Sequence, residues 1–281
     1  MTILVLGGTG KTGGALTKLL HEAGLPFLVT SRSGKAPEPY QAVVFDWFNP
    51  STFENPFKAD SNMDKVYLVM PVGYYDTLPV VAPFINLSIS KGVKRIVLLT
   101  AIQGEPGSPT YGVVHSYLAT KDIEYAVLRP SWFIENFSSV FYQSIRENNE
   151  ICSAAGNGKI PWISSADVAR AAFDTLTTPE SIRKDLLIGG PDLITYDEAA
   201  AMLSSVLGRP VKHKRNTPEE QVELYSKFVS SPEFAKVLVD MEVGAARGVE
   251  EAYLKEPPSR LYIGRDKLED YFKASRNIWI K

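Results

Sequence analysis

Short apolar runs alternate with segments of helical spacing through the first half of the chain. Six runs of four or five residues are rich in aliphatic and β-branched side chains, and several are apolar at nearly every position. They span residues 3–6, 27–30, 42–45, 66–69, 95–99 and 125–128. Runs of this kind, separated by helices, predict a parallel sheet that is covered on both faces. We therefore expect a doubly wound α/β fold, in which ligands gather at the carboxyl ends of the strands.

Helical patterns dominate the second half. The first half has two clear helical segments, residues 13–23 and 78–90, and each is followed by a glycine that suits a helix end. Later helical segments follow one another with only short strands between them. They are residues 165–176, 195–207, 218–228 and 232–248. We expect a doubly wound core over residues 1–152 and a smaller, mostly helical lobe over residues 153–281, with some elements returning to the core.

A glycine loop follows the first strand. It satisfies two spacings at once, Gly8-x-Gly10-x-x-Gly13 and Gly7-x-x-Gly10-x-x-Gly13. Such glycines allow the tight turn, the approach of a pyrophosphate and close packing of the helix, whose N-terminus attracts the anion. The phosphate loop of nucleoside triphosphatases would need glycine where this chain has Val5. The sequence therefore predicts a dinucleotide site on a Rossmann core. The residues expected to form it are Gly7, Thr9, Gly10, Lys11, Thr12 and Gly13.

Charges near the second strand indicate which dinucleotide binds. NAD-dependent enzymes usually carry an acid at the end of this strand for the ribose hydroxyls, whereas this chain has Arg32, with Lys35 close by. A guanidinium suits a 2′-phosphate, and Lys11 adds a cation near the phosphates. We therefore expect NADPH/NADP⁺ rather than NADH. The alternative for Arg32 is a solvated surface charge.

Residues after the third, fourth and fifth runs complete the expected cofactor site. Asp46, at the end of the third run, is expected either to bond the adenine edge or to cap a helix over residues 50–57. Met70 and Pro71 follow the fourth run, and Thr100 follows the fifth. Because the carboxyl ends of parallel strands share one edge of the sheet, these three residues are also expected to contact the cofactor.

A Tyr-x-x-x-Lys pair raises the question of a proton donor. Tyr117 and Lys121 match the pair with which short-chain dehydrogenases protonate a carbonyl oxygen. In those enzymes the pair lies early on a long helix, whereas here the next strand begins at Tyr125 and leaves barely two helical turns. Tyr117 is a candidate catalytic residue, and the alternative is an aromatic side chain on a helix surface.

The segment that leaves the sixth strand, residues 128–137, brings aromatic and acidic groups to the carboxyl edge. The aromatic residues here predict either a flat substrate pocket or part of the core. The residues expected to bind substrate are Trp132, Phe133, Asn136 and Tyr142, with Phe137 and Phe141 as further aromatic neighbours. Glu135 is a candidate catalytic residue because a carboxylate beside aromatic rings can hold a cationic substrate; a solvated acid at a helix start is the alternative.

Composition narrows the class of protein. With 44% hydrophobic and 22% charged residues, 281 residues can form a large globular core, and a net charge of −2 argues against nucleic-acid binding. No apolar run is long enough to span a bilayer, and the first residues lack the basic region of a signal peptide. The single cysteine, Cys152, and three widely separated histidines predict neither a disulfide nor a metal site. We expect a soluble cytoplasmic protein.

Several segments together resemble the NmrA-like atypical short-chain dehydrogenases, and among them the fungal festuclavine and agroclavine dehydrogenases of ergot alkaloid biosynthesis. The matching residues are 1–12 (MTILVLGGTGKT), 45–47 (FDW), 127–136 (VLRPSWFIEN), 153–164 (SAAGNGKIPWIS), 190–198 (GPDLITYDE) and 206–209 (VLGR). The resemblance spans nearly the whole chain. Relatives of this kind carry a histidine where this chain has Tyr117.

The resemblance implies NADPH-dependent reduction of a cyclic iminium in an indole alkaloid precursor, with no nucleic-acid or membrane partner and an upstream pathway enzyme as a candidate partner. An iminium carbon is already electrophilic and its reduction gives a neutral amine, so no general acid is needed. Trp132, Phe133 and Glu135 would then supply stacking, shape and a counter-charge. Two alternatives remain: an NADPH-dependent quinone, enone or carbonyl reductase, in which Tyr117 donates a proton, and a regulator of the NmrA type that binds NADP(H) without turnover.

Overall fold

The computed structural model describes residues 1–180 and 182–280, which form two compact units. Unit 1 contains Met1–Pro71, Asp76–Arg129 and Ser165–Leu186. Unit 2 contains Val72–Tyr75, Pro130–Ser164 and Leu187–Lys281. The chain therefore passes between the units several times, and the structure does not divide it at residue 152, where we expected the boundary. The physical reason is that residues 130–152 bury their apolar side chains in the core of unit 2.

A parallel sheet of eight strands, in the order β10-β8-β6-β5-β4-β1-β2-β3, organises the fold. The strands are β1 Thr2–Val5, β2 Phe27–Ser31, β3 Ala42–Val44, β4 Met63–Val69, β5 Arg95–Leu99, β6 Glu124–Pro130, β8 Arg183–Gly189 and β10 Leu261–Ile263. The six predicted strands are all present, and the doubly wound α/β fold is confirmed. β8 and β10 are additions that our sequence analysis did not assign to this sheet.

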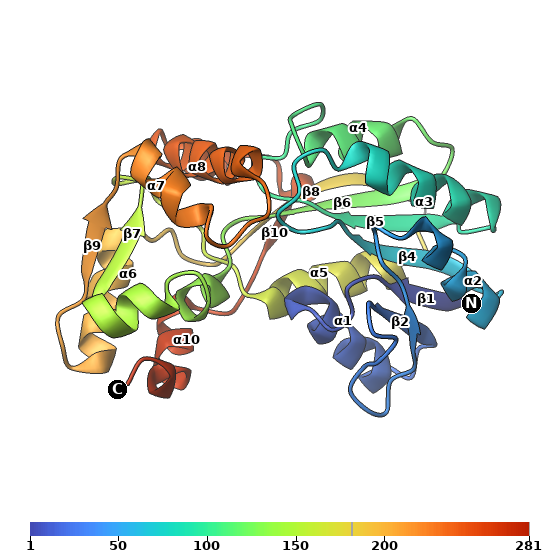
Figure 1. The fold of residues 1–281 in the computed structure, drawn as a ribbon, viewed down its shortest axis with the longest axis horizontal. Helices are drawn as coiled ribbons and strands as arrows, with labels where there is room; N and C mark the ends of the chain where they lie inside the picture. Colours follow the sequence, from blue (N-terminus) through green and yellow to red (C-terminus); the bar gives the residue numbers. More distant parts are fainter. Residues whose placement is uncertain (181, 281) are drawn as a thin grey trace. The chain divides into compact units, whose positions relative to one another are not determined.

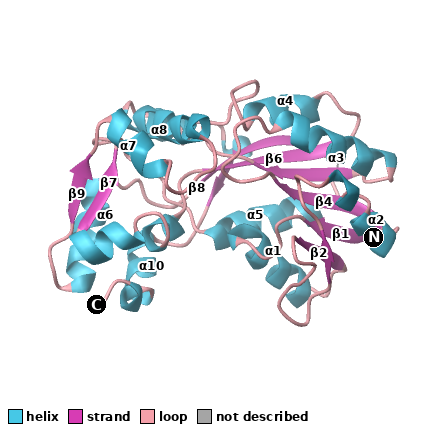
Figure 2. Ribbon diagram, in the orientation of Figure 1, coloured by secondary structure: helices cyan, strands magenta, loops and turns pink. Residues whose placement is uncertain are grey.

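Helices cover both faces of the sheet in unit 1. Figure 1 shows α1 and α5 on one face and α3 and α4 on the other, and Figure 2 shows the strands between these two layers. Their bounds are α1 Lys11–Glu22, α3 Leu78–Ser90, α4 Gly112–Ala119 and α5 Ser165–Thr177, with the short η1 Pro50–Thr52 and α2 Asn55–Ala59 after β3. Each helix returns the chain from the carboxyl edge of the sheet to its amino edge. Loops that follow the strands therefore gather at the carboxyl edge.

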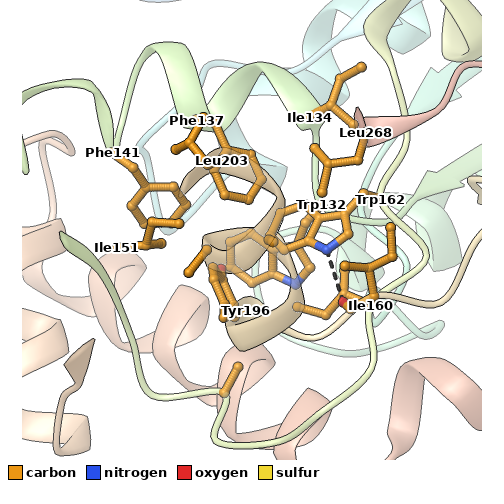
Figure 3. Packing of buried hydrophobic residues seen from close by; sticks show 14 of the residues in the cluster. Trp132, Ile134, Phe137, Phe141, Ile151, Ile160, Trp162, Tyr196, Leu203 and Leu268 are labelled. Atoms are coloured by element: carbon orange, nitrogen blue, oxygen red, sulfur yellow. Dashed lines mark hydrogen bonds between the residues drawn. The ribbon is translucent and has the colours of Figure 1, made fainter. Parts of the chain in front are cut away.

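Unit 2 has its own small sheet and core. Its elements are η2 Ile134–Ser138, η3 Ser144–Asn148, β7 Glu150–Ser153, α6 Tyr196–Leu207, β9 Lys212–Arg215, α7 Pro218–Tyr225, α8 Pro232–Ala246, α9 Val249–Tyr253, η4 Pro258–Arg260, α10 Leu268–Ala274 and η5 Arg276–Ile278. β7 and β9 pair in parallel. Figure 3 shows the aromatic core, in which Trp162 donates a hydrogen bond from its indole N–H to the carbonyl of Ile194. Phe137 and Phe141 belong to this core and are 0% and 1% exposed.

Candidate cofactor and substrate sites

The glycine loop leads into the uncapped start of α1. The N-cap residue is Gly10, which provides no side chain to accept the first N–H groups of the helix, and the first turn has no acidic residue. These N–H groups and the positive end of the helix dipole are therefore available to an anion. Lys11 and Thr9, beside the cap, are exposed. The loop has the properties of a pyrophosphate site.

Steric constraints explain why glycine occupies these positions. Gly7 adopts a φ of +65°, a conformation that residues with a side chain rarely adopt. A Cβ at Gly8 would lie 2.5 Å from Cγ1 of Val29 on β2, and a Cβ at Gly13 would lie 2.3 Å from the carbonyl oxygen of Gly7. The loop is thus packed between β2 and its own backbone, and no larger residue fits at Gly13.

A tight turn after β2 presents the two cations expected to select NADPH. The Ser31 hydroxyl accepts a hydrogen bond from the backbone N–H of Lys35 at 2.9 Å and donates one to the Lys35 carbonyl at 2.7 Å. Gly34, within the turn, has a φ of +70°. Arg32 is exposed and makes no hydrogen bond or ion pair with the described residues. Its guanidinium is thus available to an anion, and its contact with a 2′-phosphate stays a prediction.

Asp46 and Trp47 stabilise the loop after β3. The Asp46 carboxylate accepts a hydrogen bond from the backbone N–H of Phe48 at 3.0 Å, and the Asp46 N–H donates to the Thr52 hydroxyl at 2.9 Å. Asp46 therefore closes a turn before η1 and does not cap that helix, whose N-cap residue is Asn49. Trp47 donates its indole N–H to the carbonyl of Val69 at 3.1 Å, which ties this loop to the end of β4.

The ends of β4 and β5 meet the glycine loop at one edge of the sheet. β4 lies between β1 and β5, with Tyr67 opposite Val5 and Val69 opposite Leu99. Met70 and Thr100, the residues just beyond these ends, are therefore close to the loop after β1. Both are buried, and the Thr100 hydroxyl donates a hydrogen bond to the Leu128 carbonyl at 3.1 Å. Their contact with the cofactor, and that of the half-buried Pro71, stays a prediction.

Tyr117 lies on the part of α4 that is far from this edge. α4 runs back toward the amino edge of the sheet, and Tyr117 is near its C-terminal end. The phenol donates a hydrogen bond to Oδ1 of Asn86 on α3 at 2.8 Å, and Nζ of Lys121 lies 4.0 Å from the centre of the Tyr117 ring. The hydroxyl therefore has a partner in the neighbouring helix, an arrangement that favours the structural alternative.

In unit 2, residues 131–137 form the post-β6 segment. Backbone hydrogen bonds join it to the segment around Ile163: the Ile163 N–H donates to the Trp132 carbonyl at 3.0 Å, and the Ile134 N–H donates to the Ile163 carbonyl at 2.9 Å. Trp132 is 9% exposed and lies nearly parallel to the ring of Tyr225, with ring centres 6.5 Å apart. Its indole N–H is buried and has no hydrogen-bond partner among the described residues. Such an orphaned donor is uncommon in a folded protein and suits a ligand contact.

The remaining predicted substrate residues have different surroundings. Phe133, Glu135 and Asn136 are half-buried. Tyr142 accepts a hydrogen bond from the guanidinium of Arg146 one turn later. Trp132, Phe133, Glu135 and Asn136 thus lie together on one short segment. The Tyr142 hydroxyl is bonded to Arg146 instead.

Two buried carboxylates in unit 2 were missed by our sequence analysis. Glu242 on α8 and Glu250 on α9 are both 0% exposed. Glu242 occupies the apolar stripe of its helix, three residues after Val239 and seven after Ala235, which are themselves buried. An acid at this spacing was a readable signal, because buried carboxylates are rare unless they are paired or functional. Glu250 accepts a hydrogen bond from the Ser131 hydroxyl at 2.5 Å.

Neither a membrane-spanning helix nor a metal cluster is found in residues 1–180 and 182–280. No helix there combines the length and apolarity needed to cross a bilayer, and no group of three potential metal-ligating side chains gathers. Cys152 is buried, and burial raises the pKa of its thiol. A raised pKa lowers the fraction of reactive thiolate, so this cysteine is typical of a structural position.

The fold and the glycine loop define a dinucleotide-binding protein of the Rossmann class. Comparison with known proteins refines this assignment. No family model matches the sequence. The chain is 39% identical to agroclavine dehydrogenase of Claviceps fusiformis over 286 residues, which cover 100% of this chain and 99% of that protein. It is 40% identical to festuclavine dehydrogenase of Aspergillus fumigatus over 259 residues, or 89% of each chain.

A solved structure has the same fold. The NADPH-dependent quinone oxidoreductase of Escherichia coli, complexed with NADPH, superposes with a TM-score of 0.79 at 19% identity, covering 99% of this chain and all of that one. The chain belongs to the family of the agroclavine and festuclavine dehydrogenases. It is an NAD(P)H-dependent oxidoreductase.

Proposed function

We propose that this protein reduces a cyclic iminium with NADPH in a pathway to an indole alkaloid of the ergot type. The observation that carries the proposal is the similarity to agroclavine dehydrogenase over the full length of both chains, which includes the post-β6 segment and the rest of unit 2. A match confined to the glycine loop would indicate the cofactor alone. A match that includes the candidate substrate residues supports a related substrate as well.

The local structure around Tyr117 supports an acid-independent reaction. Its hydroxyl is bonded to Asn86 and lies on the half of α4 away from the carboxyl edge. A carbonyl reductase needs a group that protonates the developing alkoxide, whereas an iminium gains a hydride at carbon and becomes a neutral amine without protonation. Bound NADPH supplies that hydride.

The chain's own residues would bind and orient the two reactants. In unit 1, the uncapped start of α1 would hold the pyrophosphate, and Arg32 would bind the 2′-phosphate. In unit 2, Trp132 and Phe133 would stack on a planar ring system, and Glu135 would face its positive charge. Because an iminium is reversibly hydrolysed, the apolar surroundings of the post-β6 segment would also exclude water from the reacting carbon.

The proposed setting is the cytoplasm, with a partner enzyme upstream. A cyclic iminium of this kind forms when an amine condenses with an aldehyde of the same molecule. The class of reaction that must supply the substrate is therefore the formation of that aldehyde.

The test is NADPH consumption by the purified protein with three substrates. One is a cyclic iminium fused to an indole, supplied as its N-methyl salt, and the others are a quinone and a ketone of similar size. We expect turnover with the iminium and formation of the tertiary amine. Faster turnover of the quinone or ketone would favour the alternative reductase, and NADPH binding without consumption of any substrate would favour a sensor.

A matched pair of variants tests the role of Glu135. Glu135→Gln removes the half-buried charge, and Glu147→Gln removes an exposed charge from the nearby η3. We expect Glu135→Gln to raise KM for the iminium by roughly tenfold, since a partly buried charge pair is worth about 1 kcal/mol or more. The control should change KM less than about twofold. Equal effects of both variants would remove Glu135 from the proposed site.

A further inference from the structure

A carboxylate without a basic partner lies inside unit 2. Glu242 accepts hydrogen bonds from the Ala154 N–H at 2.7 Å, the Tyr225 hydroxyl at 2.5 Å, the Gln221 amide at 3.2 Å and the Tyr196 hydroxyl at 3.4 Å. Among the residues that the structure describes, no lysine, arginine or histidine forms an ion pair with it. All four donors are neutral, so they satisfy the carboxylate oxygens and leave the charge uncompensated.

Tyr225 connects this carboxylate to the post-β6 segment. Its hydroxyl bonds to Glu242, and its ring is tilted by only 14° from the ring of Trp132. The neighbouring residue Ser131 is held by the second buried carboxylate, Glu250. Glu250 on α9 thus holds Ser131 directly, and Glu242 on α8 holds the Tyr225 ring that lies against Trp132.

Keeping a charge at this position costs folding free energy. A buried carboxylate without a cation loses hydration that neutral hydrogen bonds replace only in part, and burial raises the pKa of Glu242 to about 7. A glutamine could occupy the same place: its carbonyl would accept from Ala154, and its amide would donate to the oxygens of Tyr196 and Tyr225, while the Gln221 amide would keep only its bond to the Cys152 carbonyl. A costly charge where a neutral group would fit points to a role in binding.

We propose that Glu242 is a positioning and specificity-determining residue of the substrate site: it fixes Tyr225 against Trp132 and gives this aromatic pair a preference for planar cations over neutral rings of the same shape. A phenol that donates to a carboxylate becomes richer in electrons, and a negative charge behind a ring strengthens the attraction of its face for a cation. In a site without water the attraction between the carboxylate and a bound cation also acts at distances beyond direct contact. The inference rests on the proposed function, because it assumes that Trp132 contacts the substrate.

The experiment compares two ligands of nearly equal shape on the NADP⁺ complex, in which no hydride is available. N-methylisoquinolinium is the cation and isoquinoline is the neutral ring. Affinities are measured by calorimetry at about pH 8.5, above the pKa of Glu242. We expect the wild-type protein to prefer the cation. Glu242→Gln should lower affinity for the cation about tenfold and leave the neutral ring within about twofold, whereas Glu242→Asp, which keeps the charge, should retain the preference.

Two controls separate the possible failures. Asp240→Asn, on the exposed side of the same helix, removes a charge without touching the cluster and should leave both affinities unchanged. Trp132→Ala should weaken both ligands. If Trp132→Ala changes neither affinity, the proposed substrate site is wrong. In the other case, Trp132→Ala weakens both ligands while Glu242→Gln affects the cation and the neutral ring equally or not at all. That result, or a wild-type protein without a preference for the cation, would overturn the inference about Glu242 alone.

Discussion

Replacing Glu242 by glutamine should change how the stability of this protein depends on pH. Burial raises the pKa of this carboxyl from an ordinary value of 4.5 to about 7 in the folded chain. Between these two values the folded protein holds a proton that the unfolded chain has released. The contribution of Glu242 to the free energy of unfolding therefore falls as pH rises from about 4.5 through the folded pKa of about 7. Above that pKa this contribution changes no further with pH.

The size of the effect follows from the shift. A change of about 2.5 pKa units, at 1.36 kcal/mol for each unit, corresponds to about 3 kcal/mol. Glutamine does not titrate, so Glu242→Gln should gain up to this amount relative to the wild-type protein between about pH 5 and about pH 8.5. The Tm of the variant minus that of the wild-type protein should therefore be larger at about pH 8.5 than at about pH 5. In a chain of this length the increase corresponds to roughly 6 °C or more.

The assay is chemical and thermal unfolding of both proteins across this pH range, followed by circular dichroism. Asp240→Asn, which removes an exposed carboxylate from the same helix, is the control and should keep the wild-type dependence on pH. Parallel pH profiles for Glu242→Gln and the wild-type protein would show that the carboxyl titrates normally. In that case the account of an uncompensated buried charge would be refuted.

Three further predictions concern unit 1. Arg32→Ala should raise KM for NADPH about tenfold and spare NADH, since a charge-assisted phosphate contact is worth roughly 1.5 to 3 kcal/mol; equal losses in steady-state assays with both cofactors would contradict the assignment. Tyr117→Phe should leave kcat/KM within about threefold, and a hundredfold loss would identify a general acid. Gly13→Ala should abolish NADPH binding in a fluorescence titration, because the new Cβ would lie 2.3 Å from the Gly7 carbonyl, whereas Gly14→Ala, with 3.6 Å to the nearest atom, should still bind.

The sequence predicted the six strands of the N-terminal half and the glycine loop that is expected to bind the cofactor. Both depend on local rules. Short β-branched runs that are apolar at nearly every position favour strands covered on both faces, and the turn at Gly7 requires a backbone conformation that favours glycine. The bounds of the helix over residues 78–90 were likewise predicted and found unchanged, because its ends are marked by Pro79 and Gly92.

Contacts between distant segments were not readable in the same way. β8 and β10 belong to the large sheet, although they follow helical segments of the second half. The segment after β6 joins unit 2 at Pro130, because its aromatic side chains find their neighbours in α6 and α10. The sheet or unit that a segment joins depends on which apolar surfaces meet in the folded chain. A short apolar run is compatible with several such arrangements.

The candidate cofactor and substrate sites show the same division between local sequence rules and tertiary contacts. The sequence alone predicted where the cofactor binds and which charged group would contact its 2′-phosphate, since these features lie within about 35 residues of the N-terminus and follow from turn geometry and helix polarity. Only the tertiary structure decided that Tyr117 bonds to Asn86 and that Glu242, more than 100 residues after Trp132, lies behind the ring that stacks on it. Burial and hydrogen-bond partners are properties of the folded chain, and they decide whether an acid is a surface charge or part of a site.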